Sequence, residues 1–263
     1  MSKTKVIAFA NNKGGSGKTT TCSNVGCAMA LSGKKVLMID GDMQLNLTIS
    51  YFDEEKALEF AKSGKTIYTA IKEEKDLTDL IVNTDIKGLD IIPSSSLMSS
   101  IEFDLFSKWQ REFILKKCLE KVCATGYYDF VLIDAPPTLG GWVMNVMCAS
   151  NYLIIPVEAS PWGLFGLASM FDFCEQVKRV NPTLEVLGIA ITKADERKKY
   201  FKQTLETLKE LEGVRLFENY IRVDSAIEWA QDNSRPVVDF KKKSRSAIEY
   251  TELTKEILKY ANR

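Results

Sequence analysis

The sequence contains no histidine among its 263 residues. This absence excludes Ser-His-Asp and Cys-His catalysis, zinc or haem held by histidine, and a histidine pH switch. The sequence also has no excess of charge of one sign, because Lys plus Arg and Asp plus Glu both total 35. Without an overall positive field, any contact with nucleic acid must come from a local basic patch.

No Cys-x-x-C pair occurs among the six cysteines, so we expect buried, reduced thiols rather than a metal or redox site. The N-terminal apolar run is too short for the core of a signal peptide. The uncharged stretch 135–157 is long enough to be considered as a membrane span, but three prolines and two glycines interrupt it. We therefore expect a loop, a short helix and a strand there.

Short apolar runs alternate with segments of helical periodicity along most of the chain. The runs that predict strands are 6–10, 36–39, 89–92, 130–133, 152–157, 186–192 and 214–221. The segments that predict helices are 19–31, 108–122, 164–180, 200–211, 225–231 and 244–260. Strands that are apolar throughout are buried on both faces, which is typical of a parallel sheet covered by helices. We predict an α/β fold, with one domain over residues 1–263 and a mostly parallel, twisted sheet flanked by helices.

The stretch Asn11–Thr20 (NNKGGSGKTT) lies between a predicted strand and a predicted helix, where a phosphate-binding loop belongs. Small residues let successive backbone N–H groups turn inward around oxyanions, and the dipole of the following helix favours negative charge. Lys18 is expected to reach the β- and γ-phosphates, and the Thr19 hydroxyl to bind Mg²⁺. The residues expected to contact the nucleotide here are Lys13, Gly14, Gly15, Ser16, Gly17, Lys18, Thr19 and Thr20.

This loop departs from two common glycine patterns. The pattern G-x-x-x-x-G-K-[ST] fails at its first position, which is Asn12, and a second lysine, Lys13, precedes the double glycine. The dinucleotide pattern G-x-G-x-x-G fails because it needs glycine at Thr20. Binding of a phosphoanhydride is the interpretation that remains.

Asp134 ends an apolar strand and is expected to hold Mg²⁺ through water. Asp40 and Asp42 follow another strand, and both lie within reach of the region where the γ-phosphate is expected. In a nucleotide-hydrolysing loop of this kind, the protein acts mainly by positioning groups and neutralising charge.

The variant K-G-G-x-G-K-T resembles the deviant Walker A motif of the ParA/MinD family of P-loop ATPases, and more specifically the ParA/Soj-type partition ATPases. Four further segments are similar to that family: 36–48 to its switch I region, 130–137 to its Walker B strand and switch II, and 189–195 and 234–238 to its later strand and C-terminal segments. The resemblance implies a Mg²⁺-dependent ATPase in which Asp42 orients the attacking water and Asp40 supports the Mg²⁺ shell. The family usually has proline where this chain has Met43.

The resemblance also assigns a role to Lys13. Two subunits would enclose two ATP molecules face to face, and each Lys13 would cross to the nucleotide of the other subunit. Dimerisation would then depend on the triphosphate state. Thr192, Lys193 and Asp195 lie where related proteins hold the adenine, and Arg222 is expected to form the other wall of that site.

Three functions compete within this resemblance. The first is a partition ATPase for a plasmid, mobile element or chromosome, whose ATP dimer binds DNA without sequence preference and is released by a ParB-like partner. The second is a MinD-like ATPase that cycles on membranes, which needs an amphipathic C-terminal anchor; the stripe at 244–260 has too many acidic residues for that, so we expect it to pack on the sheet. The third, a metabolic or iron–sulfur relative, is disfavoured by the lack of a Cys-x-x-C pair. The partition ATPase is therefore the preferred prediction.

The residues considered for DNA contact are Arg197, Lys198, Lys199, Lys202, Lys241, Lys242, Lys243 and Arg245. Each basic run is also compatible with an ordinary solvated face. We expect the protein to be cytoplasmic and associated with the nucleoid of a bacterium, without contact to membranes. Because the first predicted strand begins so early, we expect no N-terminal helix-turn-helix.

Overall fold

A single sheet organises the chain in the computed structural model, which describes residues 4–160, 162–164 and 166–262. Within these residues seven strands form the sheet in the order β3-β4-β2-β5-β1-β6-β7. Their bounds are β1 Lys5–Phe9, β2 Val36–Asp40, β3 Val82–Asn83, β4 Leu89–Ile92, β5 Phe130–Asp134, β6 Tyr152–Glu158 and β7 Glu185–Thr192. The described pairings are parallel apart from that of β3 with β4. The predicted α/β fold with a mostly parallel sheet is therefore confirmed.

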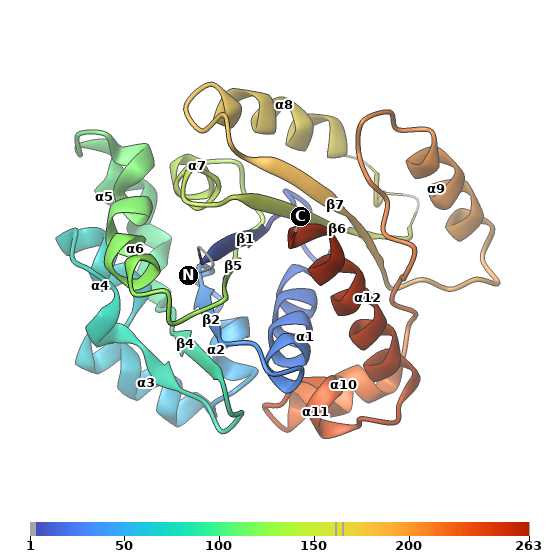
Figure 1. Ribbon diagram of the computed structural model, residues 1–263, viewed down its shortest axis with the longest axis horizontal. Coiled ribbons are helices and arrows are strands. Elements are labelled where there is room, and N and C mark those ends of the chain that lie inside the picture. The colour runs from blue at the N-terminus through green and yellow to red at the C-terminus, as the bar shows by residue number, and fades with distance from the viewer. Residues whose placement is uncertain (1–3, 161, 165, 263) are drawn as a thin grey trace.

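Helices cover both faces of the sheet (Figure 1). Their bounds are α1 Lys18–Leu31, α2 Asn46–Ile49, α3 Glu54–Ser63, α4 Ile67–Glu73, α5 Ile101–Phe106, α6 Ile114–Ala124, α7 Gly141–Cys148, α8 Leu167–Lys178, α9 Lys199–Lys209, α10 Ser225–Asp232, α11 Val237–Phe240 and α12 Arg245–Ala261. Three short 3₁₀ helices also occur in the described chain: η1 Thr78–Leu80, η2 Ser96–Ser100 and η3 Arg111–Phe113.

Alternate residues of each central strand enter two separate cores. Ile7 and Phe9 of β1 pack with α1 and α12, whereas Val6 and Ala8 pack with the helices α4 to α8. Because both faces are buried, the central strands are apolar at most positions, with Asp40 and Asp134 as the last residues of β2 and β5. This requirement explains why their positions could be predicted from continuous apolar runs.

The C-terminal helix α12 packs mainly on α1 and α11 and meets the sheet mainly at β7, so the expectation that residues 244–260 pack on the sheet is met in part. Tyr250, Leu253 and Ile257 are fully or almost fully buried in the core that α12 shares with α1. The apolar stripe of α12 is thus used inside the molecule. Among the described residues, no helix is both long enough and apolar enough to cross a membrane.

The strand predicted at 214–221 does not form. The segment still lies along β7, where the N–H groups of Phe217 and Ile221 donate to the carbonyls of Ile189 and Ile191 at 3.0 and 2.9 Å. Between these two bonds, the backbone N–H groups of Glu218 and Asn219 donate to the Glu256 carboxylate on α12, at 2.9 and 3.2 Å. A side chain therefore interrupts the continuous ladder that a further strand would need.

Two predicted helices begin later than expected. The segment 108–122 becomes helical as α6 only from Ile114, because Gln110 has a positive φ of 49°. The segment 164–180 becomes helical as α8 from Leu167, after Gly166 with φ of 102°. Position 165 of that segment lies outside the described residues, as do 1–3, 161 and 263 of the expected domain. The loop, helix and strand expected in 135–157 are confirmed as α7 and β6 with the loop before them.

Candidate functional site

The loop between β1 and α1 is shaped by glycine. Gly15 and Gly17 have φ of 73° and 83°, a region that side-chain-bearing residues rarely adopt. A Cβ at Gly17 would also lie 3.2 Å from the Thr192 side chain. Gly17 precedes α1, whose N-terminus has no side-chain cap and no acid in its first turn. The first N–H groups of α1 are therefore available to an external anion.

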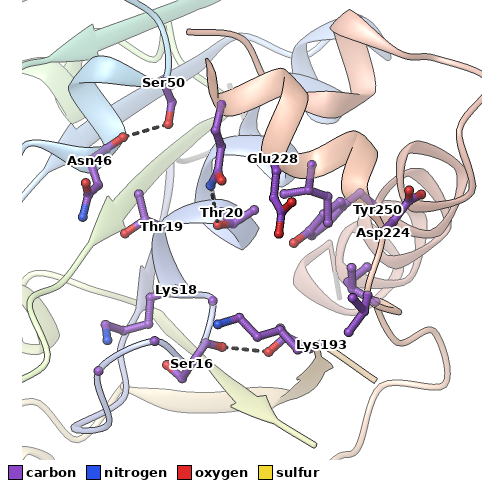
Figure 2. Close-up of a pocket in the computed structure, with 18 of the residues that line it drawn as sticks. Ser16, Lys18, Thr19, Thr20, Asn46, Ser50, Lys193, Asp224, Glu228 and Tyr250 are labelled. Carbon is purple, nitrogen blue, oxygen red and sulfur yellow. Dashed lines mark hydrogen bonds between the residues drawn. The ribbon is translucent and has the colours of Figure 1, made fainter. Parts of the chain in front are cut away.

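A cavity of about 880 Å³ lies over this helix end. The phosphate-binding loop forms one side together with residues of the loop 41–45 between β2 and α2, which we call the acid loop. The segments after β7 and in α10 form the other side (Figure 2). The lining residues include Gly14, Gly15, Ser16, Gly17, Lys18, Thr19, Thr20, Asp42, Asn46, Thr192, Lys193, Arg222, Asp224, Glu228, Gln231 and Tyr250. The volume lies in the range that small-molecule ligands occupy in proteins.

Lys18 brings a buried positive charge to this cavity. Its Nζ donates a hydrogen bond to the carbonyl of Lys13 at 3.1 Å. Burial lowers the pKa of Lys18, while the negative charges of Asp134 and Asp42 oppose this shift. A cation held between carboxylates and the helix N-terminus suits a ligand that carries several negative charges.

Asp134 stands out because both of its carboxylate oxygens are buried without a hydrogen-bond partner. The Thr19 hydroxyl is near enough to lower its pKa somewhat but does not complete a hydrogen bond of good geometry. Burial, with the nearby charge of Asp40, raises the pKa of Asp134 well above its usual value. An unpartnered buried carboxylate is costly unless a cation or donor joins it. Asp134 thus fits a Mg²⁺ ion.

Among the described residues, no three Asp, Glu, Cys or His side chains converge as a protein-only metal site. Mg²⁺ usually keeps several waters and takes one or two carboxylates together with phosphate oxygens. Asp134, with the Thr19 hydroxyl beside the cavity, matches that sparse set. The residues present therefore fit Mg²⁺ that arrives with a nucleotide.

Asp40 differs from Asp134 because its oxygens already have donors. Its Oδ2 accepts from the Thr48 N–H and hydroxyl at 2.8 and 2.6 Å, and its Oδ1 accepts from the Asp42 N–H at 3.2 Å. Burial nonetheless raises the pKa of Asp40 to about 6. Asp40 therefore fixes the acid loop to α2, whereas Asp42 lies on the cavity wall.

Lys13 does not line the cavity, and its charge is paired within the chain. Its Nζ forms an ion pair with Glu158 at 2.7 Å and a hydrogen bond with Ser160 at 3.1 Å. Glu158 is the last residue of β6, and Ser160 follows it two residues later. Burial acts to raise the pKa of Glu158, but the hydrogen bond and charge of Lys13, together with the charge of Lys193, lower this pKa overall. The structure therefore separates Lys13 from the other loop residues that were expected to bind the nucleotide.

The four residues expected near the base are only partly brought together. Thr192 donates to the Ser16 carbonyl at 2.8 Å, and Lys193 lies beside it on the cavity wall. Arg222 lines the cavity, but its guanidinium pairs with Glu249 at 2.5 Å and with Glu196 at 3.1 Å. Asp195 does not line the cavity. It pairs with Arg197 at 2.9 Å, which lowers the pKa of Asp195 to about 2.

Several residues of the site were missed by the sequence analysis. Gln231 on α10 donates to the Thr20 hydroxyl at 3.3 Å, and Glu228 and Tyr250 line the same wall (Figure 2). No local motif marks them, since α10 and α12 approach α1 only in the folded chain. Glu158 could have been predicted from the sequence, because it is the last residue of β6, as Asp40 and Asp134 are of β2 and β5.

The basic residues considered for DNA contact form two groups. In the first, Arg197 is paired with Asp195, while Lys198, Lys199 and Lys202 have no carboxylate within ion-pair distance among the described residues. In the second, Lys242 pairs with Asp239 at 3.6 Å, and Arg245 lies 3.8 Å from Glu249. Lys241 lies over the Trp229 ring at 3.4 Å. Intramolecular acids therefore neutralise part of this charge.

Comparisons with known proteins agree with this geometry. The family model described as an AAA domain matches residues 4–186. The sporulation initiation inhibitor protein Soj of Bacillus subtilis is 32% identical over 254 residues, which cover 96% of this chain and 98% of Soj. The chromosome partitioning protein ParA of Caulobacter vibrioides is 31% identical over 255 residues, which cover 97% of this chain and 94% of ParA.

Two solved structures share the fold and were determined with nucleotide. A plasmid partition protein from Borrelia burgdorferi B31 bound to AMPPNP has a TM-score of 0.80 and 26% identity, with 98% of this chain and 99% of that chain covered. Cobyrinic acid a,c-diamide synthase from Mycobacterium smegmatis, with a bound ATP analogue and magnesium, has a TM-score of 0.83 and 26% identity, with 98% and 96% covered.

Proposed function

Since this chain belongs to the Soj/ParA family of partition ATPases, we propose that it hydrolyses ATP with Mg²⁺ to segregate DNA. The observation that carries the proposal is a cavity lined by an uncapped helix N-terminus and the Lys18 cation, with the unpartnered Asp134 carboxylate buried next to Lys18 and Thr19. The helix N–H groups and the Lys18 ammonium lack an anion, and the buried Asp134 carboxylate lacks a cation. A polyphosphate supplies the first and Mg²⁺ supplies the second.

Within this proposal, the backbone of residues 14–19 and the Lys18 ammonium hold the phosphates. Asp134 and the Thr19 hydroxyl hold Mg²⁺, which neutralises charge on the phosphate oxygens when it is bound. Asp42 faces the cavity and orients the attacking water. Asp40 acts through the acid loop, because its hydrogen bonds to Thr48 and Asp42 keep that loop in place.

The Lys13 side chain supports a dimer in which each subunit completes the site of the other. Lys13 lies outside its own cavity, and about a quarter of its side chain is exposed. A second subunit that presents ATP to this face offers Lys13 a polyphosphate in place of the single Glu158 carboxylate. ATP then favours the dimer, because only the triphosphate state supplies that additional charge.

DNA and a ParB-like protein are the partners that we propose. Lys198, Lys199, Lys202 and Lys243, whose ammonium groups have no carboxylate partner in the described part of the chain, are available for phosphates of duplex DNA of any sequence. A membrane anchor at the C-terminus receives no support, because the apolar face of α12 is buried against α1.

Hydrolysis assays with separate additions test this function. Phosphate release from Mg²⁺-ATP is measured alone, with random duplex DNA, with phosphatidylglycerol liposomes, and with DNA plus a DNA-binding protein encoded beside this chain. We expect a large increase only with DNA and the protein partner together. Stimulation by liposomes would instead assign the chain to membrane cycling, and no hydrolysis in any mixture would refute the ATPase itself.

A further inference from the structure

Three large aromatic side chains are exposed on and just after α5. Phe103, Phe106 and Trp109 are 83%, 76% and 92% exposed. Phe103 and Phe106 are one turn apart on the same helix face, and Trp109 follows three residues later. Exposed aromatic side chains that gather in one place mark interaction sites more often than scattered ones do. We refer to these three side chains as the α5 aromatic face.

Unpaired cations follow the α5 aromatic face in the chain. Arg111, Lys116 and Lys117 are exposed, and no carboxylate of the described chain lies within ion-pair distance of them. The Arg111 guanidinium lies over the Phe106 ring, 5.6 Å from its centroid. Lys108, by contrast, is already paired with Glu74 at 2.7 Å. These three cations are therefore available for carboxylates that a partner could supply.

The acids of α5 are occupied by the protein itself. Glu102 accepts hydrogen bonds from the backbone N–H groups of Gly141 and Trp142 at 2.9 and 3.0 Å. Asp104 accepts from the Tyr68 hydroxyl at 3.0 Å. These carboxylates lie on the short helix that carries Phe103 and Phe106, so a flat anionic lipid surface would approach them together with the rings. A narrow helix can contact the rings and the cations while avoiding both acids.

The same helix is connected to the acid loop of the site. Glu102 holds the first turn of α7, and the indole N–H of Trp142 in that turn donates to the Gly41 carbonyl at 2.9 Å. Gly41 lies between Asp40 and Asp42, and its N–H donates to the Asp134 carbonyl at 2.9 Å. Displacement of α5 therefore acts on the backbone between the acids through two hydrogen-bonded steps.

We propose that the α5 aromatic face binds an acidic amphipathic helix of a protein partner, and that Glu102 transmits this binding to the acid loop. Apolar residues one turn apart on the partner helix match the spacing of the three rings, and its carboxylates match Arg111, Lys116 and Lys117. Binding stands independently of the proposed function, whereas the transmission to the acid loop rests on ATP hydrolysis.

Binding is tested by selection from a library of displayed helices that have a fixed apolar stripe and random residues elsewhere. The library is selected on the full chain after depletion on the F103A/F106A/W109A variant. We expect selected helices to be rich in Asp and Glu. The triple variant should weaken binding of a synthetic selected helix at least tenfold, whereas Y200A, which removes a half-exposed tyrosine on α9, should not.

Three outcomes of this experiment overturn the proposal. Selection of lysine-rich helices would contradict the charge argument, and failure to recover any helix that depends on the three aromatic residues would remove the site. In a parallel arm, phosphatidylglycerol vesicles are sedimented with the chain. Binding to vesicles that is lost in F103A/F106A/W109A would assign this face to lipid instead.

Transmission is tested with the synthetic acidic helix and the E102Q variant. We expect the helix to change the rate of ATP hydrolysis by wild type at least threefold. E102Q should bind the helix with the same affinity, but its rate of hydrolysis should be the same with and without the bound helix. An unchanged wild-type rate with the helix bound would refute transmission, whereas a chain that never hydrolyses ATP would refute the proposed function and leave the binding result intact.

Discussion

Two buried aspartates in one site have opposite surroundings. Asp40 receives three hydrogen bonds from Thr48 and Asp42, whereas Asp134 receives none from the described residues. A carboxylate with three donors has little capacity left for a metal, and one without donors needs a cation. We therefore assign the main carboxylate contact with Mg²⁺ to Asp134 and a positioning role to Asp40.

The first prediction concerns D134N. Removal of this unpaired charge should raise the melting temperature of the ligand-free protein, because a buried, unpartnered carboxylate is destabilising. The same change should lower Mg²⁺-dependent hydrolysis by roughly 100-fold or more, since about 3 kcal/mol of charge neutralisation is lost. Calorimetry with and without Mg²⁺-ATP, combined with rate measurements, checks both effects. A variant that is stabilised by Mg²⁺-ATP as strongly as wild type would contradict the assignment.

The second prediction concerns pH and Asp40. The folded-state pKa of about 6 lies above the ordinary value of 3.8, so the folded chain binds this proton more tightly than the unfolded chain. Stability should therefore fall as pH rises from about 3.8 through 6, by about 3 kcal/mol over the full transition, with about half of the fall above pH 5. Urea unfolding of ligand-free wild type and D40N at pH 5 to 8 measures this. Equal slopes for the two proteins would contradict it.

At the scale of the element, the phosphate-binding loop was predictable because its requirements are local. Gly14, Gly15 and Gly17 followed by Lys18 lie directly between a strand and a helix, and the structure places a cavity there. The central strands were predictable because burial on both faces requires continuous apolar residues. The segment 214–221 also reads as apolar, but Glu256, which is far away in the chain, takes the backbone donors of Glu218 and Asn219 and interrupts the pairing with β7.

Other elements could not be predicted from local pattern. The helices α2, α4 and α5 are short, and their positions depend on distant partners. For example, α2 is held by the bonds from Thr48 to Asp40, and α5 by the bonds from Glu102 to the first turn of α7. The wall formed by α10 was missed for the same reason, since Gln231 meets Thr20 only across the folded molecule.

The third prediction compares two glycines with positive φ. Gly17 has φ of 83° and a side chain 3.2 Å from its Cβ position, whereas Gly33 has φ of 91° and open space around it. Alanine at either position should cost about 1–2 kcal/mol of backbone strain. G17A should additionally abolish nucleotide binding, because Thr192 and the loop must move apart. Thermal melting and binding of a fluorescent ATP analogue separate the two effects. If G33A lost nucleotide binding as well, strain alone would be the cause.

At the scale of the whole molecule, the ion pair of Lys13 with Glu158 links the phosphate-binding loop to the end of β6. Within the proposed dimer, Lys13 must leave Glu158 before it can reach another subunit. The pair is about one-quarter exposed on both sides, so its contribution to stability is at most about 1 kcal/mol. A contribution of that size lets Lys13 leave Glu158 for the nucleotide of another subunit, while the pair remains favoured in the single subunit.

The fourth prediction follows from that competition. E158Q removes the carboxylate that holds Lys13 and should lower the ATP concentration needed for dimerisation by up to about fivefold, as a pair worth about 1 kcal/mol permits. K13A should abolish the ATP-dependent dimer. Analytical ultracentrifugation across an ATP titration measures the dimer fraction of both variants. S160A is the control, because it removes only the hydrogen bond from Lys13 to Ser160 and keeps the Glu158 carboxylate. A full-strength dimer of K13A, or an E158Q variant that dimerises less readily than wild type, would contradict the proposed exchange.

The bond from the Trp142 indole to the Gly41 carbonyl provides the molecule with an internal optical probe. The chain has four tryptophans; Trp109, Trp162 and Trp229 are at least half exposed, whereas Trp142 is 1% exposed. Phenylalanine at the three exposed positions would leave a single emitter, fastened to the backbone between Asp40 and Asp42. Rearrangement of the acid loop during turnover could then be followed as a change in emission wavelength, without any attached dye.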